Sequence, residues 1–98
     1  MTLRLDHLAI SCDRLTDGVS AVETLFGLPM AGGGKHPLMG THNRLLGLGD
    51  LYLEVIAIDP EAPPPGRPRW FNLDHFSGPP RLTNWIVYAV AMAGVCLA

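Results

Sequence analysis

The stretch that decides the fold reads RLDHLAI at residues 4–10, and it returns as RLTNWIV at residues 81–87. In the first repeat, aliphatic and polar side chains follow the two-residue period of a β-strand. His7 interrupts its apolar series, and Asn84 occupies the same place in the second repeat. On spacing alone, a lone histidine on such a face is more often core filling than a ligand.

The composition is that of one small globular domain. Of the 98 residues, 48% are hydrophobic and 16% are charged, with a formal net charge of −2. Seven Lys and Arg residues form no basic stripe, which argues against a nucleic-acid-binding surface. Cys12 and Cys96 lie at opposite ends of the chain and fit neither a disulfide framework nor a zinc ribbon. We therefore expect a reducing, cytoplasmic compartment.

The two ends of the chain bear on membrane targeting. Arg4 and Asp6 interrupt the N-terminal apolar stretch, so we expect no secretory signal. Residues 85–98 carry no charge, but these fourteen residues fall short of the roughly 20 that a membrane helix needs. Buried core is the favoured interpretation of this segment, and membrane attachment is the minor alternative.

The predicted elements follow the order strand, helix, three strands, loop, strand. The expected ranges are a strand at 3–10, an amphipathic helix at 15–26 capped by Asp13 or Thr16 and ended by Gly27, a short irregular strand within 27–40, two strands within 41–58 that turn at Gly49 and Asp50, a Pro-rich loop at 60–69 held by Trp70, Phe71 and Phe76, and a strand at 82–90.

This order predicts an α+β fold, with one βαβββ module and a mixed or antiparallel curved sheet. We divide the chain into that module at residues 1–59, a Pro-rich loop or linker at 60–81, and an apolar C-terminal strand or helix at 82–98. The last segment reads as the first strand of a second, incomplete module, because it repeats the opening stretch.

Glu54 is the second unusual residue, because it lies among the aliphatic side chains of LYLEVIAI. An unpaired carboxylate in a central strand costs several kcal/mol, so it needs a partner. That partner is either an arginine such as Arg44 or a divalent metal shared with His7. One histidine and one carboxylate on separate strands form a common ligand set.

Three polar residues open the third strand. His42 and Arg44 share one face and Asn43 lies on the other. They either line a pocket for a polar ligand or face water. His36 and His75 have no partner in the sequence, so we expect both on the surface. No nucleophile motif accompanies them.

The sequence resembles a glyoxalase-like domain of the vicinal oxygen chelate superfamily, which also holds bleomycin resistance proteins and dioxygenases. The matching stretches are LDHLAI, LFGLP, GTHNRLL, LYLEVIAIDPEAP and RWFNLD, from Leu5 to about Asp74. The resemblance implies two βαβββ modules around a cavity. It also implies that His7 and Glu54 match the first two metal-ligand positions.

What the resemblance implies about activity is metal-dependent lyase, isomerase or dioxygenase chemistry on a small oxygenated substrate. Glu54 would be both catalytic residue and ligand, and His42, Asn43 and Arg44 would contact the substrate. The second repeat offers Asn84 where a third ligand belongs. A homodimer with two His7–Glu54 pairs would rebuild a four-ligand cavity. The alternatives are a non-catalytic small-molecule binding module or a truncated, inactive fragment.

Overall fold

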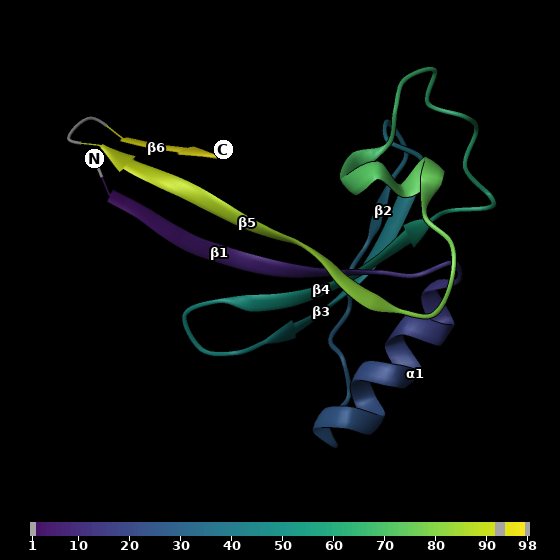
Figure 1. Cartoon of the computed structure of the whole chain (residues 1–98), viewed down its shortest axis with the longest axis horizontal. Coiled ribbons are helices and arrows are strands. Elements are labelled where there is room, and N and C mark those ends of the chain that lie inside the picture. The colour runs from purple at the N-terminus through teal and green to yellow at the C-terminus, as the bar shows by residue number, and fades with distance from the viewer. Residues whose placement is uncertain (1, 92–93, 98) are drawn as a thin grey trace.

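One mixed sheet organises the chain in the computed structural model, which describes residues 2–91 and 94–97. Its six strands lie in the order β2-β3-β4-β1-β5-β6 (Figure 1). The elements are β1 (Thr2–Ser11), α1 (Leu15–Phe26), β2 (Lys35–His36), β3 (Thr41–Gly47), β4 (Tyr52–Ile58), the 3-10 helix η1 (Trp70–His75), β5 (Arg81–Ala91) and β6 (Gly94–Leu97). The expected α+β class and βαβββ order are confirmed.

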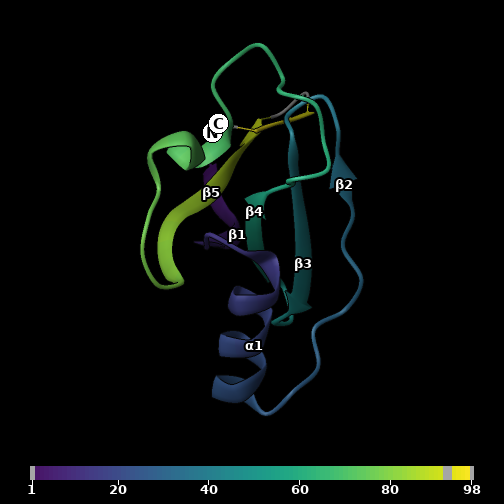
Figure 2. The same ribbon diagram turned by 90° about the vertical axis from the view of Figure 1, so that its right-hand side faces the viewer.

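The hydrophobic core lies between α1 and one face of the sheet. β1 and β4 pair in parallel, and the other neighbouring strands pair antiparallel. Helix α1 packs on β4 and β3 (Figure 2). The buried side chains between them are Cys12, Val22, Leu46, Leu53, Val55 and Ala57. Alternate residues of β4, including Glu54, therefore face away from α1.

Helix α1 ends as the sequence predicts and begins differently. Gly27 adopts a left-handed conformation with φ of 66°, and its N–H donates to the carbonyl of Glu23. At the other end Arg14 is the N-cap, without a side-chain hydrogen bond. The predicted cap by Asp13 or Thr16 is wrong, because the Asp13 carboxylate accepts a hydrogen bond from the N–H of Gly78 instead.

The two sequence repeats pair with each other around a local pseudo-twofold axis. β1 and β5 run antiparallel with Leu8 opposite Trp85, and these residues occupy equivalent places in the two repeats. The register shifts once on each side of this centre, leaving Asp6 and Thr83 as the extra residues. Asp6 and Thr83 are also equivalent in the repeats, so each strand carries its bulge at the same place.

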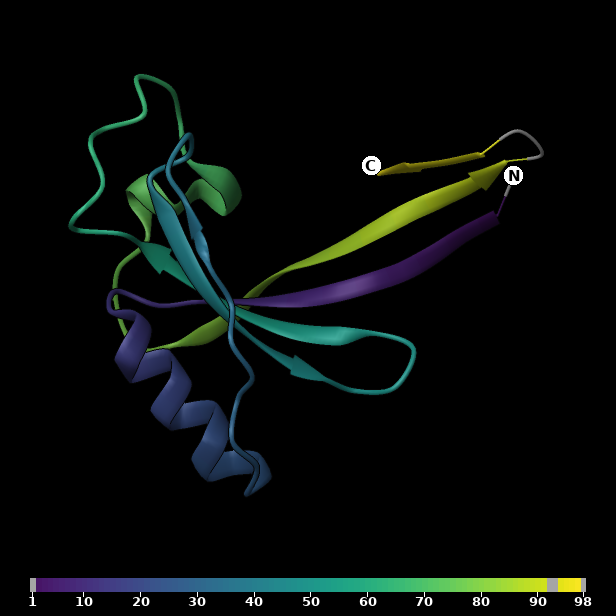
Figure 3. The same cartoon turned by 180° about the vertical axis from the view of Figure 1, so that it is seen from behind.

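Helix η1 lies across the sheet from α1 (Figures 1 and 3). Its anchor is Leu73, which is only 2% exposed, whereas Trp70, expected to hold the loop, is 42% exposed. Arg69 clamps it further, because its backbone N–H and guanidinium both donate to the Asp74 carboxylate. These hydrogen bonds lower the pKa of Asp74. Among the described residues no helix is long and apolar enough to span a membrane.

Candidate functional site

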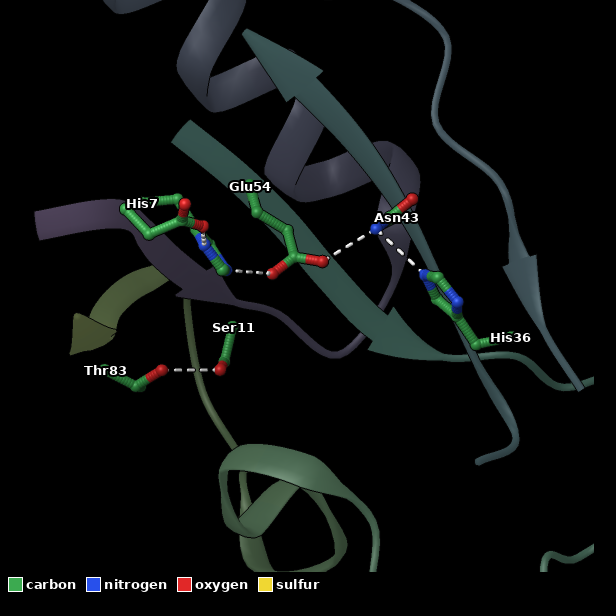
Figure 4. Close-up of polar contacts among 7 residues, drawn as sticks. His7, Ser11, His36, Asn43, Glu54 and Thr83 are labelled. Carbon is green, nitrogen blue, oxygen red and sulfur yellow. Dashed lines mark hydrogen bonds and ion pairs between the residues drawn. The ribbon is translucent and has the colours of Figure 1, made fainter. Parts of the chain in front are cut away.

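Five polar side chains form a continuous chain of contacts on the sheet face opposite α1 (Figure 4). It runs from Asp6 through His7, Glu54 and Asn43 to His36. The steps are 2.8 Å from Asp6 Oδ2 to His7 Nδ1, 3.1 Å from His7 Nε2 to Glu54 Oε1, 2.7 Å from Asn43 Nδ2 to Glu54 Oε2, and 3.1 Å from Asn43 Nδ2 to His36 Nε2. The chain of contacts thus joins residues from four strands, and the Glu54 carboxylate at its centre contacts His7 and Asn43.

The sheet register explains why these side chains meet. Ala9 pairs with Glu54 on one side and with Asn84 on the other, so all three belong to one row across the sheet. His7 lies one row away, paired with Tyr52 and Ile86. Side chains in adjacent rows of one face approach closely enough for long groups to touch. Ala9, between Glu54 and Asn84 in this row, is fully buried.

His7 is held on three sides. Its Nδ1 faces Asp6, its Nε2 faces Glu54, and its ring stacks on Tyr52 with centroids 4.5 Å apart and planes 7° apart. The bulge at Asp6 allows the first contact, because neighbouring residues of a regular strand point to opposite faces. Both partners are carboxylates, so the arrangement requires two ring N–H groups or a proton on one carboxyl.

Tyr52 lies near two carboxylates, those of Asp6 and Glu54. Burial raises the pKa of its hydroxyl, and the nearby carboxylates of Asp6 and Glu54 raise it further. The phenol therefore stays protonated at neutral pH and remains a hydrogen-bond donor beside His7.

Glu54 is buried, at 7% exposure, with a partner for each oxygen. Its neighbour Asn43 is equally buried and also accepts a 2.8 Å hydrogen bond from the Gly34 N–H. The alternative prediction that Arg44 contacts Glu54 is wrong. Arg44 pairs in register with Val55, which belongs to the core beneath α1 on the other face.

The three predicted substrate contacts are therefore divided between two faces. Asn43 lies beside Glu54, whereas His42 pairs with Ala57 of the α1 core and Arg44 lines a cavity of about 420 Å³ with residues of α1. The structure brings His7, Glu54 and Asn43 together and leaves His42 and Arg44 apart from them.

Two members of the chain were missed by the sequence interpretation. Strict alternation along the strand would place Asp6 on the face opposite His7, and the bulge between Leu5 and His7 overrides it. His36 was expected on the surface without a partner, but it contacts Asn43 and meets the Trp70 ring edge-on at 5.3 Å. His75 is exposed as expected. A register-shifting bulge leaves no signal in one sequence, and the pairing of β2 with β3 depends on long-range contacts.

The donor set bears directly on metal binding. Within residues 2–91 and 94–97, no group of three or more His, Cys, Asp or Glu side chains is placed to hold a metal ion. His7 and Glu54 form a pair, and the position equivalent to His7 in the second repeat holds Asn84. Any ion held here would take at most two strong ligands from the described chain.

Comparison with known proteins identifies the family of this chain. Residues 5–93 match the family described as glyoxalase-like domain. The chain belongs to that family. No curated protein matches the sequence.

Among solved structures, the glyoxalase-like chain resembles a hypothetical protein of Bacillus halodurans, with a TM-score of 0.53 and 22% identity. The match covers 64% of this chain and 46% of the other, so the chain spans less than half of that protein. At this identity the likeness concerns the fold.

Proposed function

We propose that this glyoxalase-like domain binds a divalent metal ion through His7 and Glu54 and acts on a small oxygenated substrate as a lyase, isomerase or dioxygenase. The observation that carries the proposal is the 3.1 Å separation of His7 Nε2 and Glu54 Oε1. Two ligand atoms at right angles on one ion, each about 2.1 Å away, lie about 3.0 Å apart. The pair therefore fits adjacent positions around such an ion.

The outer partners support the same assignment. Asp6 accepts from His7 Nδ1, which fixes the ring and directs the lone pair of Nε2 toward Glu54. Asn43 occupies Glu54 Oε2 and leaves Oε1 directed at His7. Carboxylate–histidine pairs and hydrogen-bonded carboxylates of this kind typically orient metal ligands. Binding would displace the proton between Nε2 and Oε1, so affinity should rise with pH.

The residues present define the chemistry that the site offers. A bound divalent ion would polarise a carbonyl or enediolate oxygen as a Lewis acid. Glu54 is the carboxylate that would accept a proton from a carbon beside that oxygen, through a lone pair that neither the ion nor Asn43 uses. His7 and Tyr52 form a flat wall next to it, and the Tyr52 hydroxyl supplies a hydrogen-bond donor.

A second function, a non-catalytic small-molecule binding module, is favoured by one observation. The position equivalent to His7 holds Asn84, and an amide is a poor ligand for a transition metal. In that function the His7–Glu54 pair would remain a hydrogen-bonded pair that closes the sheet face.

Calorimetric titration with Mn²⁺ and Zn²⁺ separates the two functions. We expect one ion per chain, with affinity lost in both His7→Ala and Glu54→Gln. Glu54→Gln keeps the shape and the hydrogen bond from Asn43, so the loss would not reflect unfolding. His75→Ala is the matched control, because this histidine is exposed and outside the polar chain. Equal binding by all four proteins, or no binding by the parent, would overturn the proposal.

A further inference from the structure

A cavity of about 370 Å³ opens where η1 faces β5, and its lining includes Asn84. The other lining side chains come from the η1 region and the start of β5, and include Phe71, Asn72, His75, Phe76 and Arg81. Its two walls lie on either side of residues 77–80 in the sequence and face each other only in the fold.

The charge of the lining selects the kind of ligand. None of the residues that line the cavity is acidic, and Arg81 brings a permanent positive charge. Its guanidinium lies 4.2 Å from the centre of the Phe76 ring, and its Nη1 donates to the Ser77 carbonyl. These two contacts hold the group in place and leave other N–H donors for a ligand. A fixed guanidinium of this kind suits the planar fork of a carboxylate.

The backbone beside the cavity is strained. Phe71 and Asn72 both adopt left-handed conformations, with φ of 58° and 56°. Asparagine tolerates this region, but phenylalanine rarely enters it. Strain of this sort persists where surrounding structure imposes it, and it gathers at ligand sites. Here the pair is followed by the buried Leu73, lies between the hydrogen-bonded Arg69 and Asp74, and forms part of the cavity wall.

The cavity opens on the sheet face that carries Glu54. Asn84 and Glu54 flank Ala9 in one row, two strand spacings apart. That places their backbones about 10 Å from each other. Arg81 lies further along the same face, opposite Ser11, whose hydroxyl hydrogen-bonds the bulged Thr83 at 2.6 Å. Arg81 and Glu54 therefore share one face of the sheet, with the fully buried Ala9 and Ser11 on the strand between them.

We propose that this cavity binds the carboxylate of a small organic acid, with Arg81 as its charged partner and Phe71 and Phe76 beside its apolar part. This proposal does not depend on the proposed function, because none of the lining residues belongs to the His7–Glu54 pair.

The test is a titration of the full chain with benzoate, monitored by NMR in buffer that a chelating resin has freed of metal ions, so that metal binding plays no part. Benzyl alcohol serves as the neutral analogue. We expect saturable shifts at Asn84 and in η1 with benzoate at about 10 mM or below, and at least tenfold weaker binding of the alcohol. His7→Ala should bind benzoate as the parent does, which separates this result from the proposed function.

Two variants locate the site. Arg81→Gln should weaken benzoate binding about tenfold. Asn72→Asp adds a negative charge at a position whose backbone accepts aspartate, and it should weaken binding at least threefold without unfolding the chain. Arg67→Gln is the control, because Arg67 lines a separate cavity with His36 and Trp70. Absence of saturable binding, equal binding of the alcohol, or a loss confined to Arg67→Gln would overturn the proposal.

Discussion

The contact between Asn43 and Glu54 gives the sharpest test of the buried polar chain. Asn43→Asp replaces the amide that donates to Glu54 Oε2 at 2.7 Å with a carboxyl of the same shape. The acceptor for the Gly34 N–H is retained. Both residues are 7% exposed, so two carboxylates cannot be ionised together there. The folded variant must bind a proton between them.

That proton sets the magnitude and the pH dependence. An ordinary carboxyl has a pKa of about 4, and holding a proton on one costs about 1.4 kcal/mol for each pH unit above that value. Asn43→Asp should therefore lower the free energy of unfolding by about 4 kcal/mol at pH 7 and by about 1 kcal/mol at pH 5. The folded state binds more protons than the unfolded state in this range, so the deficit shrinks as the pH falls.

Urea unfolding followed by circular dichroism from pH 5 to pH 7.5 measures this difference. Asn72→Asp is the matched control, since the same change at an exposed position should alter stability by less than about 0.5 kcal/mol at every pH. An Asn43→Asp variant as stable as the parent at pH 7, or a deficit independent of pH, would refute the reasoning.

Three further predictions concern the core and the exposed apolar residues of β5. Burial raises the pKa of the Cys12 thiol from 9.0 to about 11, so the unfolded chain loses this proton first as the pH rises. The free energy of unfolding should therefore fall from about pH 9 upward in a Cys96→Ser background. Cys12→Ala should remove that part of the pH dependence. Gly18→Ala would place a Cβ 2.5 Å from Val55 Cγ1 and 2.6 Å from Cys12 Sγ. The gain of about 1 kcal/mol that alanine normally brings to a helix should therefore become a net loss of about 1 kcal/mol in the free energy of unfolding. Denaturant unfolding would measure the sign of this change. On β5, Trp85 is 74% exposed and Leu82 is 56% exposed, so we expect the chain to self-associate. Trp85→Lys should weaken that association at least tenfold. A parent chain that sediments as a monomer at every concentration would contradict this prediction.

The elements of the fold could be read from the sequence because their signals are local. The helix at 15–26 shows a clear apolar period and a C-terminal glycine, and the structure has α1 at those residues. The two strands within 41–58 surround a turn whose Gly49 has φ of 86°. The repeat of RLDHLAI predicted that β5 resembles β1, and the symmetric pairing about Leu8 and Trp85 agrees.

The site could be read only in part, because its contacts depend on register. The unusual placement of His7 and Glu54 drew attention to both, and they lie together. Asp6 escaped notice because a bulge overrides strand alternation. Arg44 was one of two partners considered for Glu54, the other being a metal shared with His7, but pairing with Val55 turns Arg44 to the α1 face. The wall of the cavity at η1 includes Phe71 and Asn72, two adjacent residues in the left-handed conformation. A phenylalanine in the sequence does not predict that conformation.

The position of a bound metal ion tests the central claim most directly. Crystals of the parent soaked in Mn²⁺ and measured at the manganese absorption edge should give an anomalous peak about 2.2 Å from both His7 Nε2 and Glu54 Oε1. The same peak should be absent from Glu54→Gln. A peak at His75 or His36 alone, or none within coordination distance of Glu54, would contradict the account.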